Sequence, residues 1–572
     1  MKKKDKKRPK LFELTDNEVA TFNLTLSNED FTSLLDYIKN FDFANLYGVK
    51  PKIKNGTLTV EVNSEQKQFK KITVSIGGNS SVTTGKPGFN IKIRGKDNLY
   101  GRSHFKLRAQ TYDASFLRQK LACDIQSRLD IPSVHANFAK LYINGKNFGL
   151  YTMMDAIKPS WIKSIYGEED TKSLYQCNSF ANVRNFNVNN CSNEDSEIVD
   201  KTEFSNFIDN INIAFEYLIG TVDHFVQNGN NVYLYKTIEG QWKFFLYDFD
   251  SDFGNMFVKH YWYSKDSNIT EVETIGTKNG FYIIPDYYSL PKEHETYTFG
   301  EYAFPGILLK KLIYDDPTRF ETILKNIVMD VFNPDVLFPH IDELKSFIDP
   351  HVKDELKLKI KKACPVCSSN IPFTYEKYNA NTEFTNINGI MGKSTALKYW
   401  ILSRYRTVCR YLELNCNPVY ISEDYFYPVN HEVENIKFVY KNDDEEEEEE
   451  EEESTTITPK EEKTTTTTIA VEEIITSIDN NEEVVTNSVN NEENIISVIS
   501  TEGKPTSIIY NEEIITSIVT DENFITNVSN DEPTIDIEDD IHFSDYAESV
   551  DAVDYEKVTD DSDNDDDTFN IK

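Results

Sequence analysis

Three aspartates stand close together near the middle of the chain, in the segment YDFDSDFG at residues 247–254. Asp248, Asp250 and Asp252 alternate with other residues, and the apolar run WKFFL leads directly into them. Such a run predicts a buried strand that delivers the carboxylates to the turn at its end. Oxygen atoms are the ligands that Mg²⁺ prefers in proteins. The segment therefore predicts either a metal-holding loop or an acidic turn without a ligand.

A fourth carboxylate and several amides precede this segment. Asp223 lies in a largely apolar stretch, and Asn228, Asn230 and Asn231 follow it. One or two carboxylates with amide oxygens suit a Mg²⁺ site that leaves room for phosphate oxygens. A further aspartate placed off the metal can accept a proton from an attacking hydroxyl group, as in phosphoryl transfer. The alternative is that Asp223 is a solvated residue at the end of a helix.

Two elements must bring these groups together. Residues 203–227 are largely apolar and predict one long helix, with Asp223 near its C-terminal end. Residues 232–236 (VYLYK) and 243–249 (KFFLYDF) predict a hairpin around Glu239-Gly240. This hairpin is expected to carry the aspartates back towards the helix end.

The remaining pattern predicts an α+β fold. Residues 19–110 alternate β-branched and aromatic runs with turns, which is typical of an antiparallel sheet, and Asn144-Gly145 predicts a hairpin. Residues 114–129 have helical periodicity, and helical patterns dominate from about 301 to 420. We therefore expect a body with a β-rich part at about 16–160, catalytic motifs at about 200–255 and a helical part at about 300–420.

Charge separates this body from a tail. The formal net charge of the 572 residues is −36. Residues 442–572 hold 42 acidic and 5 basic residues, which leaves 54 acidic and 55 basic residues in 1–441. The sequence thus predicts a basic arm at 1–15, a body at 16–440 and an acidic tail at 441–572. An acidic tail and a neutral body disfavour nucleic acid as a partner.

The tail begins with nine glutamates at 445–453 and continues with degenerate repeats of about ten residues. Each repeat, such as EEIITSI at 472–478, joins an acidic pair to a short β-branched run with Ser or Thr. Segments this short and acidic are expected to be disordered.

Cysteines and apolar runs bear on the compartment. Among seven cysteines, Cys364 and Cys367 form a Cys-Pro-Val-Cys pair without a second pair at zinc spacing, so a local disulfide or two thiols remain as alternatives. The sequence has no run of about 18 apolar residues, so it does not predict a transmembrane helix. The basic N-terminus lacks the apolar stretch of a signal peptide, so an intracellular location stays open.

Five motifs in order make the body resemble the CotH family, the spore-coat protein H kinase-like proteins. They are GGNSSVTTGKPGFNIKI (77–93), GRSHFKLRAQTYDASFLRQKLACDI (101–125), FAKLYINGKNFGLYTMMDAI (138–157), VDHFVQNGNNVYLYK (222–236) and FLYDFDSDFG (245–254). The resemblance covers roughly residues 20–420. It implies an atypical protein-kinase-like fold that uses ATP and Mg²⁺ or Mn²⁺ to phosphorylate Ser and Thr in proteins at the cell or spore surface.

The resemblance also implies roles for individual residues. Asp223 matches the catalytic aspartate, and Asp248 matches the metal aspartate, with Asp250 as a further candidate. Asn231 matches a metal-assisting amide, with Asn228 as the alternative. The candidates for contacting ATP phosphates are Lys92, its near competitor Lys106, and Arg118.

The sequence departs from ordinary kinases, because it has no GxGxxGxV, HRD or APE motif. Two hypotheses follow. The first is a CotH-like Ser/Thr kinase whose substrates include coat or surface proteins and its own tail. The second is a non-catalytic spore or cell-surface coat protein, or an adhesin, on the same scaffold.

Overall fold

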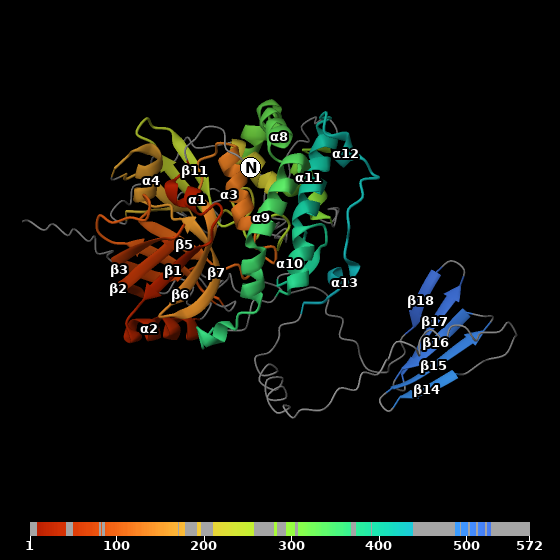
Figure 1. Ribbon diagram of the computed structural model, residues 1–572. Coiled ribbons are helices and arrows are strands. Elements are labelled where there is room, and N and C mark those ends of the chain that lie inside the picture. Colours follow the sequence, from red (N-terminus) through yellow and green to blue (C-terminus); the bar gives the residue numbers. More distant parts are fainter. Residues whose placement is uncertain are drawn as a thin grey trace, which may run out of the picture. The chain divides into compact units, whose positions relative to one another are not determined.

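The computed structural model has two compact units, and the first contains every candidate site residue (Figure 1). The units are Met1–Glu451 with Asp560–Lys572, and Glu452–Thr559. The structure describes residues 8–41, 50–78, 82, 86–169, 171–177, 191–195, 210–256, 280–282, 293–303, 307–367, 373–390 and 392–438, and the backbone of five strands between residues 487 and 527.

Seven strands of the first unit form a closed barrel in the order β1-β2-β3-β4-β5-β7-β6. Neighbouring strands are antiparallel, except that β1 pairs in parallel with β6 and closes the barrel. The strands are β1 (Ala20–Thr25), β2 (Lys52–Val62), β3 (Glu65–Gly77), β4 (Gly88–Ile93), β5 (His104–Arg108), β6 (Ala136–Ile143) and β7 (Lys146–Asp155). A β-rich first part is thereby confirmed.

Alternating side chains explain the barrel. Phe89 and Ile91 of β4 and Leu107 of β5 are buried, whereas Lys92, which follows Ile91 on β4, is exposed. Because successive side chains of a strand point to opposite faces, the apolar set fills the interior and the polar set lies outside. The hairpin at Asn144-Gly145 is confirmed, and both residues have the positive φ of a type I′ turn, 50° and 75°.

A second, four-stranded sheet has the order β11-β10-β8-β9, from β8 (Leu174–Cys177), β9 (Cys191–Asn193), β10 (Val232–Lys236) and β11 (Trp242–Leu246). The predicted hairpin around Glu239-Gly240 is β10–β11, with Val232 opposite Leu246. This sheet carries the aspartate segment at the end of β11. A short pair, β12 (Ile387–Gly389) and β13 (Gly392–Ser394), lies in the helical part.

Helices dominate the later part of the first unit, as predicted. Long helices α9 and α11 run close together in Figure 1. The helical elements are α1 (Lys10–Leu14), α2 (Asn28–Lys39), α3 (Arg118–Arg128), α4 (Pro159–Tyr166), α5 (Asn210–Ile219), η7 (His294–Thr296), α6 (Phe299–Tyr302), α7 (Ile307–Leu309), η8 (Lys310–Tyr314), α8 (Thr318–Asp330), α9 (Pro334–Leu356), η9 (Ile360–Lys362), α10 (Tyr375–Thr382), α11 (Leu397–Tyr411), α12 (Pro418–Ile421) and α13 (His431–Glu434).

The predicted helix 203–227 is too long at its C-terminal end. Helix α5 ends at Ile219, because Gly220 takes a left-handed conformation with φ of 65° and the N–H groups of Gly220 and Thr221 both bond to the carbonyl of Glu216. Asp223 therefore lies in a turn after the helix rather than on it. Residues 203–209 lie outside the described residues.

The tail differs from its predicted disorder where the backbone is described. Strands β14 (Asn487–Asn491), β15 (Asn494–Thr501), β16 (Lys504–Tyr510), β17 (Glu513–Thr520) and β18 (Asn523–Asn527) form one antiparallel sheet. The β-branched runs favour extended backbone, and one repeat of about ten residues supplies one strand. The rest of the tail and residues 1–7 of the predicted arm at 1–15 lie outside the described residues. The prediction of a loose arm is wrong for Lys10–Leu14, which forms helix α1 because Leu11 and Phe12 are buried in the barrel core.

A buried ion pair joins helix α9 to the barrel. Glu355 bonds Lys86 through Oε1, and its Oε2 accepts from the backbone N–H of Leu150 at 2.5 Å. The Lys86 ammonium also donates to the Leu150 carbonyl at 2.8 Å. Gly149 is required here, because a Cβ would lie 2.0 Å from Glu355 Oε2. The side chains of Lys86 and Glu355 are only 3% and 2% exposed, so neither charge is solvated.

Glu355→Gln is expected to lower the free energy of unfolding by about 3–5 kcal/mol, because it leaves a buried ammonium without its counter-charge. The double variant Lys86→Met/Glu355→Gln also removes the ammonium charge, so its free energy of unfolding is expected to fall by less. Urea unfolding of both variants measures the difference. A single variant as stable as the parent protein would contradict the role of this pair.

Candidate active site

Asp223 is held in one orientation by two amides. Its Oδ1 accepts a hydrogen bond from Asn230 Nδ2 at 2.6 Å, and its Oδ2 accepts one from Asn231 Nδ2 at 2.9 Å. Burial raises the pKa of Asp223, and the two amide bonds oppose that shift. A carboxylate that is oriented and made more basic than usual has the properties of a general base.

The turn with Asp223 is tied directly to the aspartate segment. The backbone N–H of Tyr247 donates to the carbonyl of Asn231 at 3.2 Å, and the N–H of Phe253 donates to the carbonyl of Ile219 at 2.6 Å. These two bonds bracket residues 248–252, which we call the aspartate loop. The predicted convergence of Asp223 and the aspartates thus rests on backbone contacts.

Arg108 connects the aspartate loop to the barrel. Its Nη1 donates to Asp248 Oδ2 at 2.5 Å, and its Nη2 and Nε donate to Asp250 Oδ2 at 2.8 and 3.0 Å. Asp248 is 22% exposed in its side chain, whereas Asp250 is 2% exposed. Asp248 is therefore the carboxylate that can reach a ligand, and Asp250 supports it from the interior.

The electrostatics of this pair follow from burial. Burial raises the pKa of Asp250 to about 6, with Asp248 adding to the shift and Arg108 opposing it. The guanidinium group keeps Asp250 largely ionised at neutral pH. The two carboxylates together raise the pKa of Arg108 despite its burial.

The sequence interpretation did not assign Arg108, although a signal existed. Alternation along β5 (HFKLR) places His104, Lys106 and Arg108 on the same outer face of the strand, and Arg108 is the last of them. What the sequence could not show is which loop meets that end of β5.

Of the two candidate lysines, Lys106 lies nearer the aspartates. Its ammonium group sits 4.6 Å from the ring centre of Tyr247, the residue before Asp248. Burial lowers the pKa of Lys106 to about 8, the cations Lys158 and Arg108 add to the shift, and Asp248 opposes it. Lys92 is exposed, one strand further away, and opposite His104.

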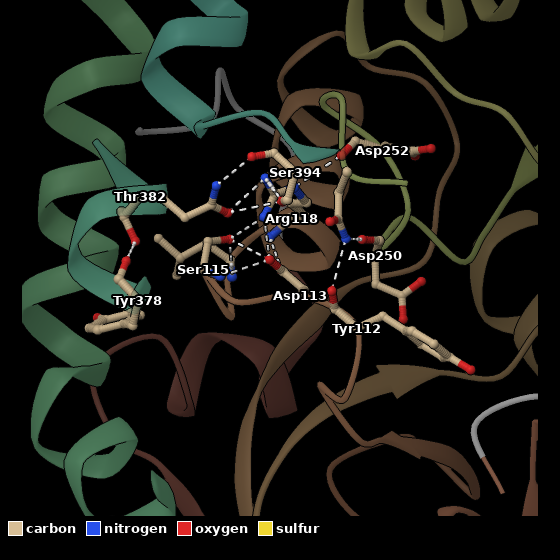
Figure 2. A network of polar contacts seen from close by, with 12 residues as sticks. Tyr112, Asp113, Ser115, Arg118, Asp250, Asp252, Tyr378, Thr382 and Ser394 are labelled. Atoms are coloured by element: carbon tan, nitrogen blue, oxygen red, sulfur yellow. Dashed lines mark hydrogen bonds and ion pairs between the residues drawn. The ribbon is translucent and has the colours of Figure 1, made fainter. Parts of the chain in front are cut away.

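Arg118 lies inside the protein and all three of its guanidinium nitrogens bond to protein groups (Figure 2). It is fully buried and pairs with Asp113. Its Nε donates to the Asp252 carbonyl at 3.0 Å, and its Nη2 donates to the Thr395 carbonyl at 2.6 Å. This placement favours a structural role in fixing the aspartate loop over the predicted phosphate contact.

The third aspartate of the loop faces the interior. Asp252 is 1% exposed, and neither of its carboxylate oxygens has a hydrogen-bond partner among the described residues. Burial and the neighbouring carboxylates raise its pKa well above the usual value, which favours the neutral acid. His224 lies beside it, with Nδ1 3.9 Å from Asp252 Oδ1 and its ring stacked on Phe249. Burial lowers the pKa of His224 to about 4, so this pair is largely uncharged.

Trp400 of α11 packs between the end of helix α5 and the end of the aspartate loop. A Cβ on Gly220 would lie 2.0 Å from its ring, and a Cβ on Gly254 would lie 2.5 Å from it. Both glycines have positive φ, 65° and 71°. The indole N–H donates to the Leu218 carbonyl at 3.0 Å. One ring therefore sets the distance between the end of α5, before Asp223, and the end of the aspartate loop.

The oxygen donors here suit a hard divalent cation that is completed by phosphate. Among the described residues, no three or more His, Cys, Asp and Glu side chains are arranged to hold a metal ion by themselves. Asp248 is partly exposed, Asp250 shares Arg108 with it, and the backbone carbonyl of Asn231 accepts from Tyr247, the residue before Asp248. Asn228 is half-buried in the Asp223 turn and remains the alternative amide. Mg²⁺ is commonly held by one or two carboxylates together with substrate phosphates, so this donor set fits it.

Six cysteines form three disulfides, Cys177–Cys191, Cys364–Cys367 and Cys409–Cys416. The local disulfide that the sequence left open is thus present at Cys364–Cys367. The seventh, Cys123, is a buried free thiol, and burial raises its pKa to about 12.

Glu216, buried in α5 behind Asp223, predicts a pH dependence. Burial raises its pKa to about 8, so the folded state binds a proton that the unfolded state releases above about 4.5. The contribution of Glu216 to the free energy of unfolding therefore decreases as the pH rises from about 4.5 to 8. Glu216→Gln is expected to be more stable than the parent by about 2–4 kcal/mol at pH 8 and equal to it at pH 4. Urea unfolding at both pH values, with exposed Glu423→Gln as the control, tests this; a pH-independent difference would contradict it.

The Trp400 spacing predicts an asymmetry between two glycines. Gly254→Ala is expected to cost about 3 kcal/mol or more, because strained backbone adds to the clash with Trp400. Gly95 has a similar φ of 80° with nothing within 4 Å of its Cβ position, so Gly95→Ala should cost about 1–2 kcal/mol. Thermal unfolding compares them. Equal losses of stability in the two variants would mean that the Trp400 ring moves aside without cost, which would contradict its role in setting this distance.

Comparison with known proteins places this geometry in a family. The model described as CotH kinase protein matches residues 74–212 and 182–407. Three similar curated proteins come from Rhizopus delemar. Invasin CotH2 is 23% identical over 396 residues, 62% of this chain and 60% of that protein; spore coat protein homolog 1 is 22% identical over 55% and 52%; Invasin CotH7 is 24% identical over 45% and 44%.

The matches thus span 44% to 60% of the length of these relatives. Among the helices that the structure describes, none is both long and apolar enough to cross a membrane. The range of the family model covers more than half of the chain and contains Arg108, Asp223 and the whole aspartate loop. The chain belongs to the CotH family.

Proposed function

We propose that this chain is an atypical protein kinase that transfers the γ-phosphoryl group of ATP to Ser or Thr of proteins. The observation that carries the proposal is the oriented carboxylate of Asp223, with Asp250 and Arg108 as charged neighbours, on a turn that backbone hydrogen bonds join to the loop of the partly exposed Asp248. The description of the matching family model as a kinase supports it. A kinase-like fold, with the barrel as one part and the helices as the other, belongs to the same proposal.

Each side chain has a defined task in this mechanism. Asp223 accepts the proton of the Ser or Thr hydroxyl, whose oxygen bonds to the γ-phosphorus while the bond to the bridging oxygen of ADP breaks. Lys106 holds the phosphates by charge, with Lys92 as the more distant alternative. A bound Mg²⁺ or Mn²⁺ would supply positive charge to offset the charge that develops on the phosphate oxygens. Asp248 with Asn231 would hold that ion, and Asp250 fixes Arg108 against the loop.

The location of the protein is part of the proposal. Three disulfides are typical of proteins that fold in an oxidising compartment. Relatives named as invasins and as a spore coat protein homolog support the cell or spore surface, and Ser and Thr of surface proteins as substrates. Those same names favour a second candidate, a coat protein or adhesin without catalysis, for which the aspartates would be dispensable.

Incubation of the full chain with labelled ATP and Mg²⁺ or Mn²⁺ separates the two candidates. Asp223→Asn and Asp248→Asn are each expected to reduce labelling of an acceptor protein by at least about 100-fold, because one removes the base and the other the metal carboxylate. Exposed Asp330→Asn on α8 is the matched control and should label normally. Folded protein that binds no nucleotide and labels no acceptor would favour the coat-protein alternative.

A further inference from the structure

A stripe of basic residues crosses the outer face of the barrel. Lys71 of β3, Arg94 after β4, Lys92 of β4 and Lys106 of β5 form this basic stripe. The register places Thr73 opposite Lys92, and the N–H of Arg94 bonds to the carbonyl of Lys71. Neighbouring side chains of paired strands share a face, so the four cations lie on one surface.

Among the described residues, carboxylates act on the basic stripe only at its Lys106 end, where Asp248 and Glu194 are charged neighbours. No Asp or Glu occurs in residues 71–75, 90–94 or 104–108. None of the four cations forms an ion pair with a described residue. Repulsion adds to burial in lowering the pKa of His104 to about 4, with Lys92 and Lys158 as its cationic neighbours. A surface of this kind attracts an anionic partner.

The basic stripe leads towards the aspartate loop. Lys106 lies over Tyr247, and Arg108, the next outward residue of β5, binds Asp248. A chain bound along the stripe would arrive at the side of Asp223 and Asp248. The partner of the stripe is therefore expected to be a polypeptide with acidic residues ahead of the group that enters the site.

The chain itself contains such a segment. Nine consecutive glutamates at 445–453 are followed directly by Ser454, Thr455 and Thr456. Fifteen residues, 439–453, lie between the end of the described body at 438 and Ser454, and an extended chain of that length reaches about 50 Å. The tether also raises the local concentration of the segment to about the millimolar range.

We propose that the basic stripe binds the glutamate run 445–453 and presents Ser454, Thr455 or Thr456 for phosphorylation. The inference rests on the proposed kinase function and gives it a substrate class, Ser and Thr preceded by acidic residues. The hydroxyl proton goes to Asp223 and ADP leaves, as in the proposed reaction. Lys71 and Arg94 lie furthest from the aspartates and act in recognition alone.

Binding is measured without catalysis. The probe is a fluorescent peptide of residues 445–460, EEEEEEEEESTTITPK, and the protein is full-length Asp223→Asn with glutamates 445–453 changed to glutamine, so that its own run does not compete. Lys71→Gln/Arg94→Gln is expected to weaken binding about tenfold at low salt. Lys325→Gln/Arg319→Gln on α8 is the matched control and should bind as the parent does. Equal affinities would overturn the inference.

Phosphorylation is then measured in the full chain with Asp223 restored and glutamates 445–453 still changed to glutamine, so that its own run does not compete with the peptide. For the acidic peptide, Lys71→Gln/Arg94→Gln should raise KM about tenfold and leave kcat unchanged. For a control peptide with glutamines in place of the nine glutamates, the same double substitution should leave KM unchanged. An unchanged KM overturns the inference while the kinase proposal stands. Stripe-dependent binding without any phosphorylation keeps the binding surface and overturns the kinase proposal instead. Thermal unfolding confirms that the variants are folded.

Discussion

The pairing of one arginine with two aspartates is the interaction on which the site depends. Arg108 comes from the barrel, and Asp248 and Asp250 come from a loop that ends a strand of a different sheet. Without the guanidinium group, two neighbouring carboxylates would repel each other at the edge of an apolar core, and the more buried one would take up a proton. The ion pair therefore fixes the loop in space and keeps it charged at the same time.

Behind this charged edge, three buried groups are held in their neutral forms. Asp252, His224 and Glu216 all have pKa values shifted towards their uncharged forms. Negative charge is thus concentrated on the carboxylates that face the ligand side, where a cation can meet it. Trp400 and Arg118 complete the support, one by filling the space between two glycines and the other by donating to loop carbonyls.

Local sequence patterns predicted which helices and strands form better than they predicted where each one begins and ends. The hairpins at Asn144-Gly145 and at Glu239-Gly240 follow from turn chemistry and alternation, which act over a few residues. The helix before Asp223 was extended too far, because apolar periodicity continues past Gly220 while the backbone does not. For the tail repeats, the sequence interpretation gave more weight to their acidity than to their strand propensity, and it therefore predicted disorder where the structure has strands.

The aspartates and asparagines of the candidate site could be named from the sequence, and their roles stay predictions, whereas the residues that support them could not be named. Asp223 and Asp248 lie on segments close in sequence, so a hairpin suffices to bring them together. Arg108 is 140 residues from Asp248, and Trp400 is 182 residues from the carbonyl it binds. Such pairings depend on how whole elements pack. Arg118 shows the converse, because a basic residue of the expected type proved to have all its nitrogens engaged inside the protein.

The buried free thiol of Cys123 bears on how the six other cysteines pair. In an unfolded chain, Cys123 is an ordinary nucleophile that competes for six other cysteines, and wrong bridges form by exchange. Once α3 packs into the core, burial suppresses its thiolate and removes it from that competition. The three observed disulfides are therefore favoured over mispaired ones when α3 packs before they close.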